Sequence, residues 1–126
     1  MVNKKVIVTG GNRGIGKGIV LSLLENGYEV LATCRNASNF DFSHQSLSVA
    51  SLDISDSSSV ETFRKSVEEF EPNILINNAG ITKDNLFLRM SEDDWNEVIN
   101  TNLSGVFKIS KLVVKGMLKS RWGRII

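Results

Sequence analysis

A glycine-rich stretch between a strand-like run and a helix-like run limits most strongly what this chain can fold into. Residues 8–19 read VTGGNRGIGKGI, and Gly10, Gly14 and Gly16 stand where a helix is about to begin. Glycine weakens a helix, but it permits a tight turn and lets other atoms approach the backbone closely. Bare N–H groups at the start of a helix, together with the helix dipole, favour an anion. The stretch therefore predicts the first turn of a strand-helix-strand unit with an anion site.

Short apolar runs rich in β-branched residues recur along the chain. They predict strands at 6–8, 30–32 and 74–76, a weaker strand near 47–52, and a further buried strand that begins at 124–126. Continuous apolar runs of this kind are typical of parallel strands that are buried on both faces.

Residues at helical spacing fill the intervals between these runs. Helices are expected from the glycine stretch to Gly27, from a capping box that Ser58 begins to Pro72, and over a long segment that Ser91 caps and Gly123 closes. The alternation predicts an α/β fold, a doubly wound (Rossmann) parallel sheet with helices on both faces.

The length fits one domain. We expect residues 1–126 to form a single nucleotide-binding Rossmann domain that stops at the start of its fifth strand. The shortest crossover lies between Arg35 and Asp53, and it has room for a short helix or none.

Composition excludes several classes of protein. The 126 residues are 41% hydrophobic and 23% charged with a formal net charge of +1, which gives no sign of nucleic-acid binding. The sequence shows no signal peptide and no apolar run of about 18 residues that could span a bilayer. A single cysteine, Cys34, excludes an internal disulfide. We expect a cytoplasmic protein with no membrane partner and no metal site.

Four motifs in order resemble the short-chain dehydrogenase/reductase family. The pattern Thr-Gly-x3-Gly-x-Gly occupies 9–16, and LDIS at 52–55, NNAG at 77–80 and NTNLSGVF at 100–107 follow with the spacing of the family. The resemblance implies a nicotinamide cofactor and hydride transfer. A glycine-rich turn without a ligand is the alternative for the first motif alone.

The resemblance places the cofactor site on these motifs and on the end of the second strand. The expected cofactor-binding residues are Thr9, Gly10, Asn12, Arg13, Gly14, Ile15, Gly16, Arg35, Asp53, Ile54, Asn78, Ala79 and Gly80. It implies that the Asp53 carboxylate contacts the adenine. Asn78 has a second interpretation, a structural tie between adjacent strands.

The end of the second strand favours NADPH over NADH. A carboxylate there would accept a hydrogen bond from the ribose 2′-OH of NAD and repel a 2′-phosphate, but Cys34 stands in its place. Arg35 follows Cys34, and Arg13 lies in the glycine stretch, so two guanidinium groups can converge on a phosphate. Two solvated surface arginines are the alternative.

The catalytic residues that the resemblance implies are incomplete. Family members use a Tyr assisted by a Lys, a Ser and an Asn to protonate the forming alkoxide. Only the Asn has a counterpart, Asn102, which is expected at a kink in the long helix; a buried residue satisfied by its own helix is the alternative. The single tyrosine, Tyr28, has no Lys four residues further on. We expect the N-terminal half of a reductase, inactive by itself.

The segment ITKDNLFLRM at 81–90 is most similar to family members that reduce 3-oxoacyl groups on acyl carrier protein to 3-hydroxyacyl groups in fatty-acid synthesis. The resemblance implies that the carrier docks at Arg121 and Arg124, near the mouth of the active site. A solvated helix end is the alternative for these arginines. Another carbonyl or alcohol reductase and a non-catalytic nucleotide-binding fragment stay open as functions.

The resemblance also implies that the full-length protein pairs through the long helix into dimers and tetramers. Trp95, Leu103 and Phe107 lie among its apolar residues. We expect burial against the sheet to account for most of these apolar positions.

Overall fold

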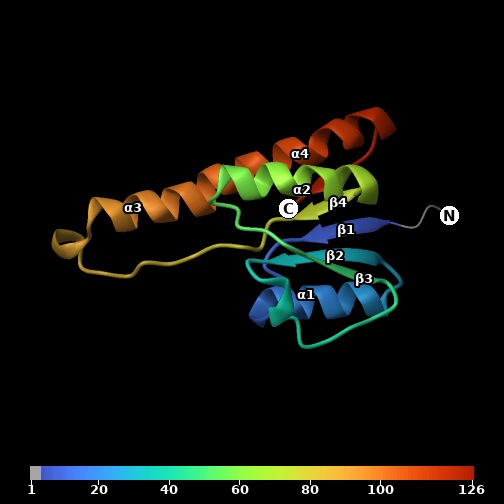
Figure 1. Cartoon of the computed structure of the whole chain (residues 1–126), viewed down its shortest axis with the longest axis horizontal. Helices are drawn as coiled ribbons and strands as arrows, with labels where there is room; N and C mark the ends of the chain where they lie inside the picture. The colour runs from blue at the N-terminus through green and yellow to red at the C-terminus, as the bar shows by residue number, and fades with distance from the viewer. Residues whose placement is uncertain (1–3) are drawn as a thin grey trace.

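The computed structural model describes residues 4–126, which build a five-stranded parallel sheet in the order β3-β2-β1-β4-β5 (Figure 1). The strands are β1 Lys5–Val8, β2 Glu29–Cys34, β3 Leu47–Ser51, β4 Ile74–Ile76 and β5 Arg124–Ile125. The helices are α1 Gly14–Glu25, α2 Ser57–Phe70, α3 Glu92–Ile99 and α4 Gly105–Ser120. Helix α1 covers one face of the sheet, and α2 and α4 cover the other (Figure 1). The predicted doubly wound α/β class and its five strands are confirmed.

Strand β1 divides the core into two layers. Val6, Ile7 and Val8 are fully buried, and successive side chains of a strand point to opposite faces. Val6 and Val8 therefore join the layer under α1, with Val20, Leu24, Val30 and Ala32. Ile7 joins the layer under α2 and α4, with Leu31, Leu52, Ile54, Val60, Phe63, Val67, Leu75, Ile109, Val113 and Met117. The strand order changes direction at β1, and in such sheets the carboxyl ends of the strands beside the change form a crevice.

The crossover from β2 to β3 contains only a single 3-10 turn, Ala37–Asn39, as its length predicts. Two aromatic side chains take the place of a packed helix. The ring centroids of Phe40 and Phe42 are 5.7 Å apart, and both rings pack against the α1 layer. Burial of these rings holds the crossover on the same face as α1.

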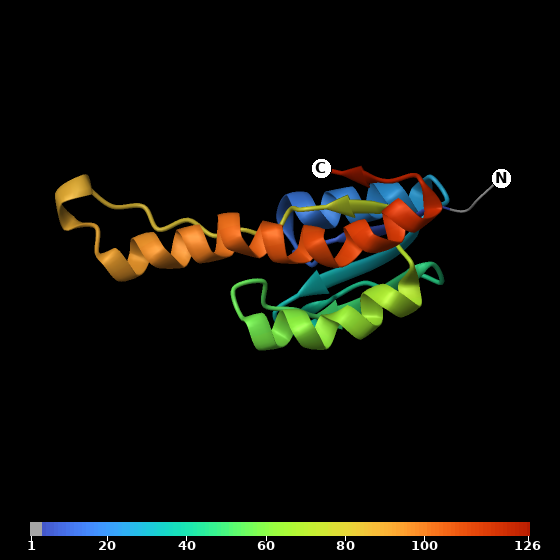
Figure 2. The same cartoon turned by 90° about the horizontal axis from the view of Figure 1, so that it is seen from above.

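The long predicted helix consists of α3 and α4 joined by a π-helical turn, Asn100–Ser104. Its first half and the preceding loop project beyond the sheet (Figure 2). Trp95 is therefore 58% exposed, and Leu103 in the π-helical turn is 66% exposed. The expectation that the sheet buries most apolar positions of this helix is wrong, because the sheet lies under α4 alone and buries only part of α4. Ile109, Val113 and Met117 of α4 are buried, but Phe107 is 65% exposed.

The start of α2 differs from the sequence-based expectation. Asp56 is its N-cap, since the Asp56 carboxylate accepts a hydrogen bond from the backbone N–H of Ser58. The prediction that Ser58 begins a capping box is therefore wrong. The Ser91 cap of α3 is confirmed, because its hydroxyl accepts a hydrogen bond from the Asp94 N–H.

The end of α4 also differs. Arg121, at φ 59°, ends the helix in the left-handed region, so the expected closing role of Gly123 is wrong. Gly123 instead lies against Met117, which leaves no room for a Cβ. Strand β5 forms, but Ile125 and Ile126 are 44% and 73% exposed rather than buried, because β5 is at the edge of the sheet. No helix within residues 4–126 combines the length and apolar character needed to cross a bilayer.

The first turn of α1 provides a test of this packing. A Cβ at Gly16 would overlap the carbonyl oxygen of Gly10, whereas Gly18, half a turn further on, has open space. We expect Gly16→Ala to lower the free energy of unfolding by more than about 2 kcal/mol, since backbone must move. The matched variant Gly18→Ala should raise it by about 0.5–1 kcal/mol. Urea unfolding followed by circular dichroism checks both values, and equal stability of the two variants would contradict the packing.

Candidate functional site

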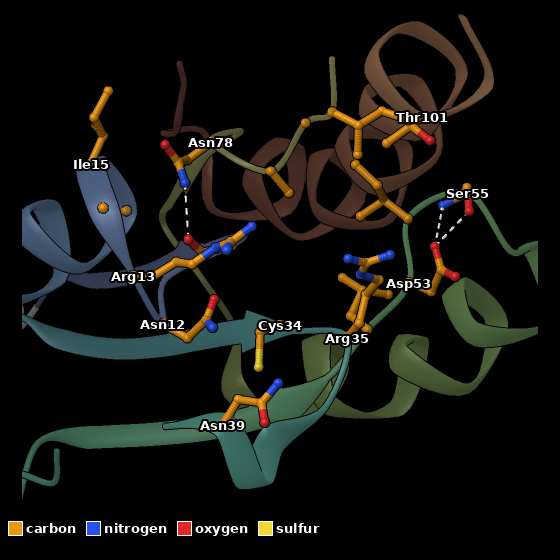
Figure 3. Close-up of a pocket in the computed structure, with 18 of the residues that line it drawn as sticks. Asn12, Arg13, Ile15, Cys34, Arg35, Asn39, Asp53, Ser55, Asn78 and Thr101 are labelled. Carbon is orange, nitrogen blue, oxygen red and sulfur yellow. Dashed lines mark hydrogen bonds between the residues drawn. The ribbon is translucent and has the colours of Figure 1, made fainter. Parts of the chain in front are cut away.

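A pocket of about 830 Å³ opens at the carboxyl ends of β1, β2 and β4 (Figure 3). Its lining contains every predicted cofactor-binding residue except Thr9, which is buried directly below the glycine turn. The other lining residues are Cys34, Asn39, Asp41, Leu52, Ser55, Ile81, Glu97 and Thr101. Cys34 follows from the expected ribose position, and Leu52, Ser55 and Thr101 lie within the motifs, whereas the sequence did not indicate Asn39, Asp41, Ile81 or Glu97 as site residues. The volume is in the range of small-molecule sites.

The glycine turn presents free backbone donors to this pocket. Gly10 and Gly14 have φ of +65° and +57°, which L side chains rarely adopt, and a Cβ at Gly14 would meet nothing within 4 Å. Helix α1 begins at Gly14 without a side-chain cap and without an acidic residue in its first turn. No side chain of α1 therefore neutralises the partial positive charge at the start of the helix. A helix start of this kind can bind a phosphate group.

Asn78 ties the end of β4 to the end of β1. Its side-chain amide donates to the carbonyl oxygens of Thr9 and Gly10 at 3.1 and 3.0 Å. The Thr9 hydroxyl oxygen in turn accepts from the backbone N–H groups of Asn78 and Ala79 at 3.1 and 3.0 Å. The structural interpretation of Asn78 is thus supported by geometry, and the same bonds fix the loop that carries Ala79 and Gly80 along the pocket.

The end of β2 carries a neutral side chain followed by a positive one. Cys34 is 8% exposed, and its thiol donates to the carbonyl oxygen of Asn36 at 2.8 Å. Arg35 and Arg13 are exposed and extend into the pocket from different sides (Figure 3). Neither guanidinium forms an ion pair with any residue from 4 to 126. This end of the pocket therefore offers two unneutralised positive groups.

Asp53 stands on the far side of the pocket from the glycine turn. Its Oδ1 accepts hydrogen bonds from the backbone N–H and the hydroxyl of Ser55, at 3.0 and 2.6 Å (Figure 3). The Asp53 N–H donates to the Ser59 hydroxyl at 2.9 Å. These bonds hold the carboxylate at the rim, where it can accept from a ligand.

Asn102 lies in a π-helical turn, where the regular α-helical pairing is interrupted at the position expected for a kink. Its side-chain amide donates to the Ile81 carbonyl at 2.8 Å and its oxygen accepts from the Ile81 N–H at 2.9 Å. The alternative of a buried residue bonded within its own helix is wrong, because this exposed side chain joins the helix to the loop after β4.

The remaining predicted site residues lie elsewhere. Arg124 begins β5, and its N–H donates to the Asn73 carbonyl beside the amino end of β4. Arg121 ends α4 at the same edge of the sheet. The pocket is at the carboxyl ends of the strands, whereas Arg124 lies at their amino ends, and neither Arg121 nor Arg124 lines the pocket. The expectation that both arginines flank its mouth is therefore wrong within one copy of the chain. Across residues 4–126 no three His, Cys, Asp or Glu side chains gather as metal ligands.

Comparison with known proteins agrees with this arrangement. The family model described as short chain dehydrogenase matches residues 4–126. The chain is 41% identical to the 3-oxoacyl-(acyl-carrier-protein) reductase of Pseudomonas aeruginosa over 98% of the chain and 53% of that protein. It is 43% identical to that of Salmonella typhimurium, over 98% and 53%, and 44% identical to that of Chlamydia pneumoniae, over 100% and 54%. The chain thus spans about half the length of the curated relatives it matches.

The buried thiol beside the pocket allows a test by reactivity. Burial raises the pKa of the Cys34 thiol above its ordinary value. A raised pKa means that less thiolate is present at pH 8, and the thiolate is the reactive form. We expect the folded chain to react with a disulfide reagent at least about tenfold more slowly than the guanidinium-unfolded chain. Equal rates at pH 8 would contradict the burial of Cys34.

Proposed function

The chain belongs to the short chain dehydrogenase family, and we propose that it is the NADP(H)-binding half of a reductase for 3-oxoacyl groups carried on acyl carrier protein. One observation supports the cofactor part of the proposal: an uncapped helix start opens into a pocket that also holds two arginines with no ion-pair partner among residues 4–126. The substrate part rests on the relatives named above, which are 3-oxoacyl-(acyl-carrier-protein) reductases. Residues 1–126 would then form one nucleotide-binding domain.

The residues of the pocket fit a phosphorylated dinucleotide. The free N–H groups of the turn around Gly14 suit the pyrophosphate, and the open space at that residue permits its close approach. Arg13 and Arg35 suit the 2′-phosphate, because guanidinium groups bind phosphate with paired donors. Asp53 suits the adenine amino group as an acceptor. NADPH supplies the hydride when it is bound.

We assign Asn102 to the reaction centre, where its side chain holds the loop at Ile81 in place. A π-helical turn interrupts the regular carbonyl pairing of a helix and often marks a functional position. The family resemblance implies that the backbone carbonyl at this position holds a water, and we assign that role to Asn102. The Ser, Tyr and Lys of the family have no counterpart in the motifs of residues 1–126, so we expect no ketone reduction by these residues alone.

We also propose that the acyl carrier protein docks at Arg121 and Arg124, although not at the mouth of the pocket of the same copy. Neither arginine lines the pocket, and Arg124 lies at the amino ends of the strands, away from the carboxyl ends where the pocket opens. The full-length protein would pair through the long helix into dimers or tetramers, as the family resemblance implies. A reducing cytoplasm fits the unpaired thiol of Cys34.

Two other functions have support from particular observations. The crossover after Arg35 holds only the single turn Ala37–Asn39, whereas the 3-oxoacyl reductases that the chain resembles carry a longer helix there. This difference favours another carbonyl or alcohol reductase of the same family. A pocket with an uncapped helix start could also belong to a nucleotide-binding domain that carries out no reduction. A dehydrogenase assay with several ketones, on a chain extended to the length of the relatives, separates these functions.

Titration calorimetry with NADP⁺ and NAD⁺ tests the cofactor proposal. We expect the chain to bind NADP⁺ more tightly, and Arg13→Gln and Arg35→Gln each to weaken NADP⁺ binding by about tenfold, since each removes a charge-assisted contact to phosphate. Binding of NAD⁺, which lacks the 2′-phosphate, should change by less than about twofold. The matched control is Arg64→Gln, because Arg64 pairs with Glu61 on α2 outside the pocket. Tighter binding of NAD⁺ by the unchanged chain would contradict the proposal.

A further inference from the structure

The pocket contains a carboxylate that works against a phosphorylated ligand unless it is neutralised. Asp41 lies in the crossover after β2 and lines the pocket with Arg35 and Asn39. A negative group here would supply the charge that Cys34 does not, and it would repel a phosphate. Asp41 in the crossover therefore places a carboxylate in the pocket, although the end of β2 has Cys34 instead of an acid.

Lys17 neutralises this carboxylate. Its ammonium group lies 3.1 Å from Oδ1 of Asp41 and 5.2 Å from the ring centroid of Phe42. Lys17 stands one helical turn after Arg13, and it is 33% exposed while Asp41 is 70% exposed. The packed ring of Phe42 beside it fixes the ammonium group against the crossover.

The other acids of the pocket are also engaged. Glu97 lies 3.4 Å from the ammonium group of Lys83, and Asp53 accepts two hydrogen bonds from Ser55. Asp41 differs from these acids because it follows Arg35 in the same crossover, near the end of the pocket that carries the arginines. Loss of its partner would therefore alter the electrostatic potential where we place the 2′-phosphate.

We propose that the Lys17–Asp41 ion pair sets the preference for a phosphorylated over an unphosphorylated adenosine ribose. This inference rests on the proposed NADP(H) function and adds two residues to its specificity. Lys17 acts through Asp41, because Lys17 itself does not line the pocket. Asp41 acts through its negative charge. When Asp41 is paired with Lys17, the positive electrostatic potential around Arg13 and Arg35 is preserved. When Asp41 is unpaired, its charge lowers that potential.

The test measures the ratio of the NAD⁺ and NADP⁺ dissociation constants at low ionic strength, where charges at exposed positions are least screened. Lys17→Met, which keeps the apolar stem beside Phe42, should lower the preference for NADP⁺ by about fivefold. Asp41→Asn should leave the preference at least as high as in the unchanged chain. Lys65→Met is the matched control, because Lys65 makes the same kind of exposed pair with Glu69 on α2.

The double variant separates the two ways in which Lys17 could act. If Lys17 acts by neutralising Asp41, Lys17→Met has no effect in the Asp41→Asn background. A fivefold loss in that background would mean direct contact with the phosphate and would overturn the inference. The inference would also be overturned if Lys17→Met had the same ratio of NAD⁺ to NADP⁺ dissociation constants as the wild-type chain and the same cooperative thermal melt. An unchanged chain with no preference for NADP⁺ would overturn the proposed cofactor together with this inference, so the two failures are distinguishable.

Discussion

The close approach of two backbone segments at the start of α1 is the constraint on which the rest of the structure depends. Gly16 lies directly against the carbonyl of Gly10, and Asn78 donates to that same carbonyl from the end of β4. One carbonyl thus joins the first helix, the central strand and its neighbour. This contact aims the uncapped helix start at the crevice between strands, where an anion can reach it.

The charges around the pocket follow from this geometry. The helix start supplies partial positive charge, and Arg13 and Arg35 add full charges near the end of β2. Each acid of the lining is paired or hydrogen-bonded, Asp41 by Lys17 among them. Positive groups gathered at one end of a crevice favour negatively charged ligands there, and this is the end at which we place the phosphate groups.

The sequence predicted the parts of the fold that depend on local pattern. Buried parallel strands must be apolar on both faces, so β1, β2 and β4 were visible as continuous runs. The glycine turn was visible because only glycine fits at Gly16 and adopts the φ of Gly14 easily. The cap of α2 was assigned wrongly, because the stretch SDSSS at 55–59 offers several residues that cap equally well.

Features that depend on distant contacts could not be predicted in the same way. The exposure of Trp95 and Leu103 depends on where the sheet ends under the long helix. The spacing of apolar residues shows which face of a helix is apolar but not whether a sheet covers it. The bonds between Asn102 and Ile81 depend on how the loop after β4 returns to the helix. The pairing of Lys17 with Asp41 depends on the path of the short crossover, which Phe40 and Phe42 determine by packing on the α1 layer.

Backbone amide chemical shifts of the isotope-labelled chain during titration with NADP⁺ test the central claim most directly. The amides of residues 14–16 should show saturable shifts that are among the largest in the chain, because their N–H groups would donate to the pyrophosphate. Shifts that do not saturate, or that concentrate away from the glycine turn, would contradict a dinucleotide site at this helix start.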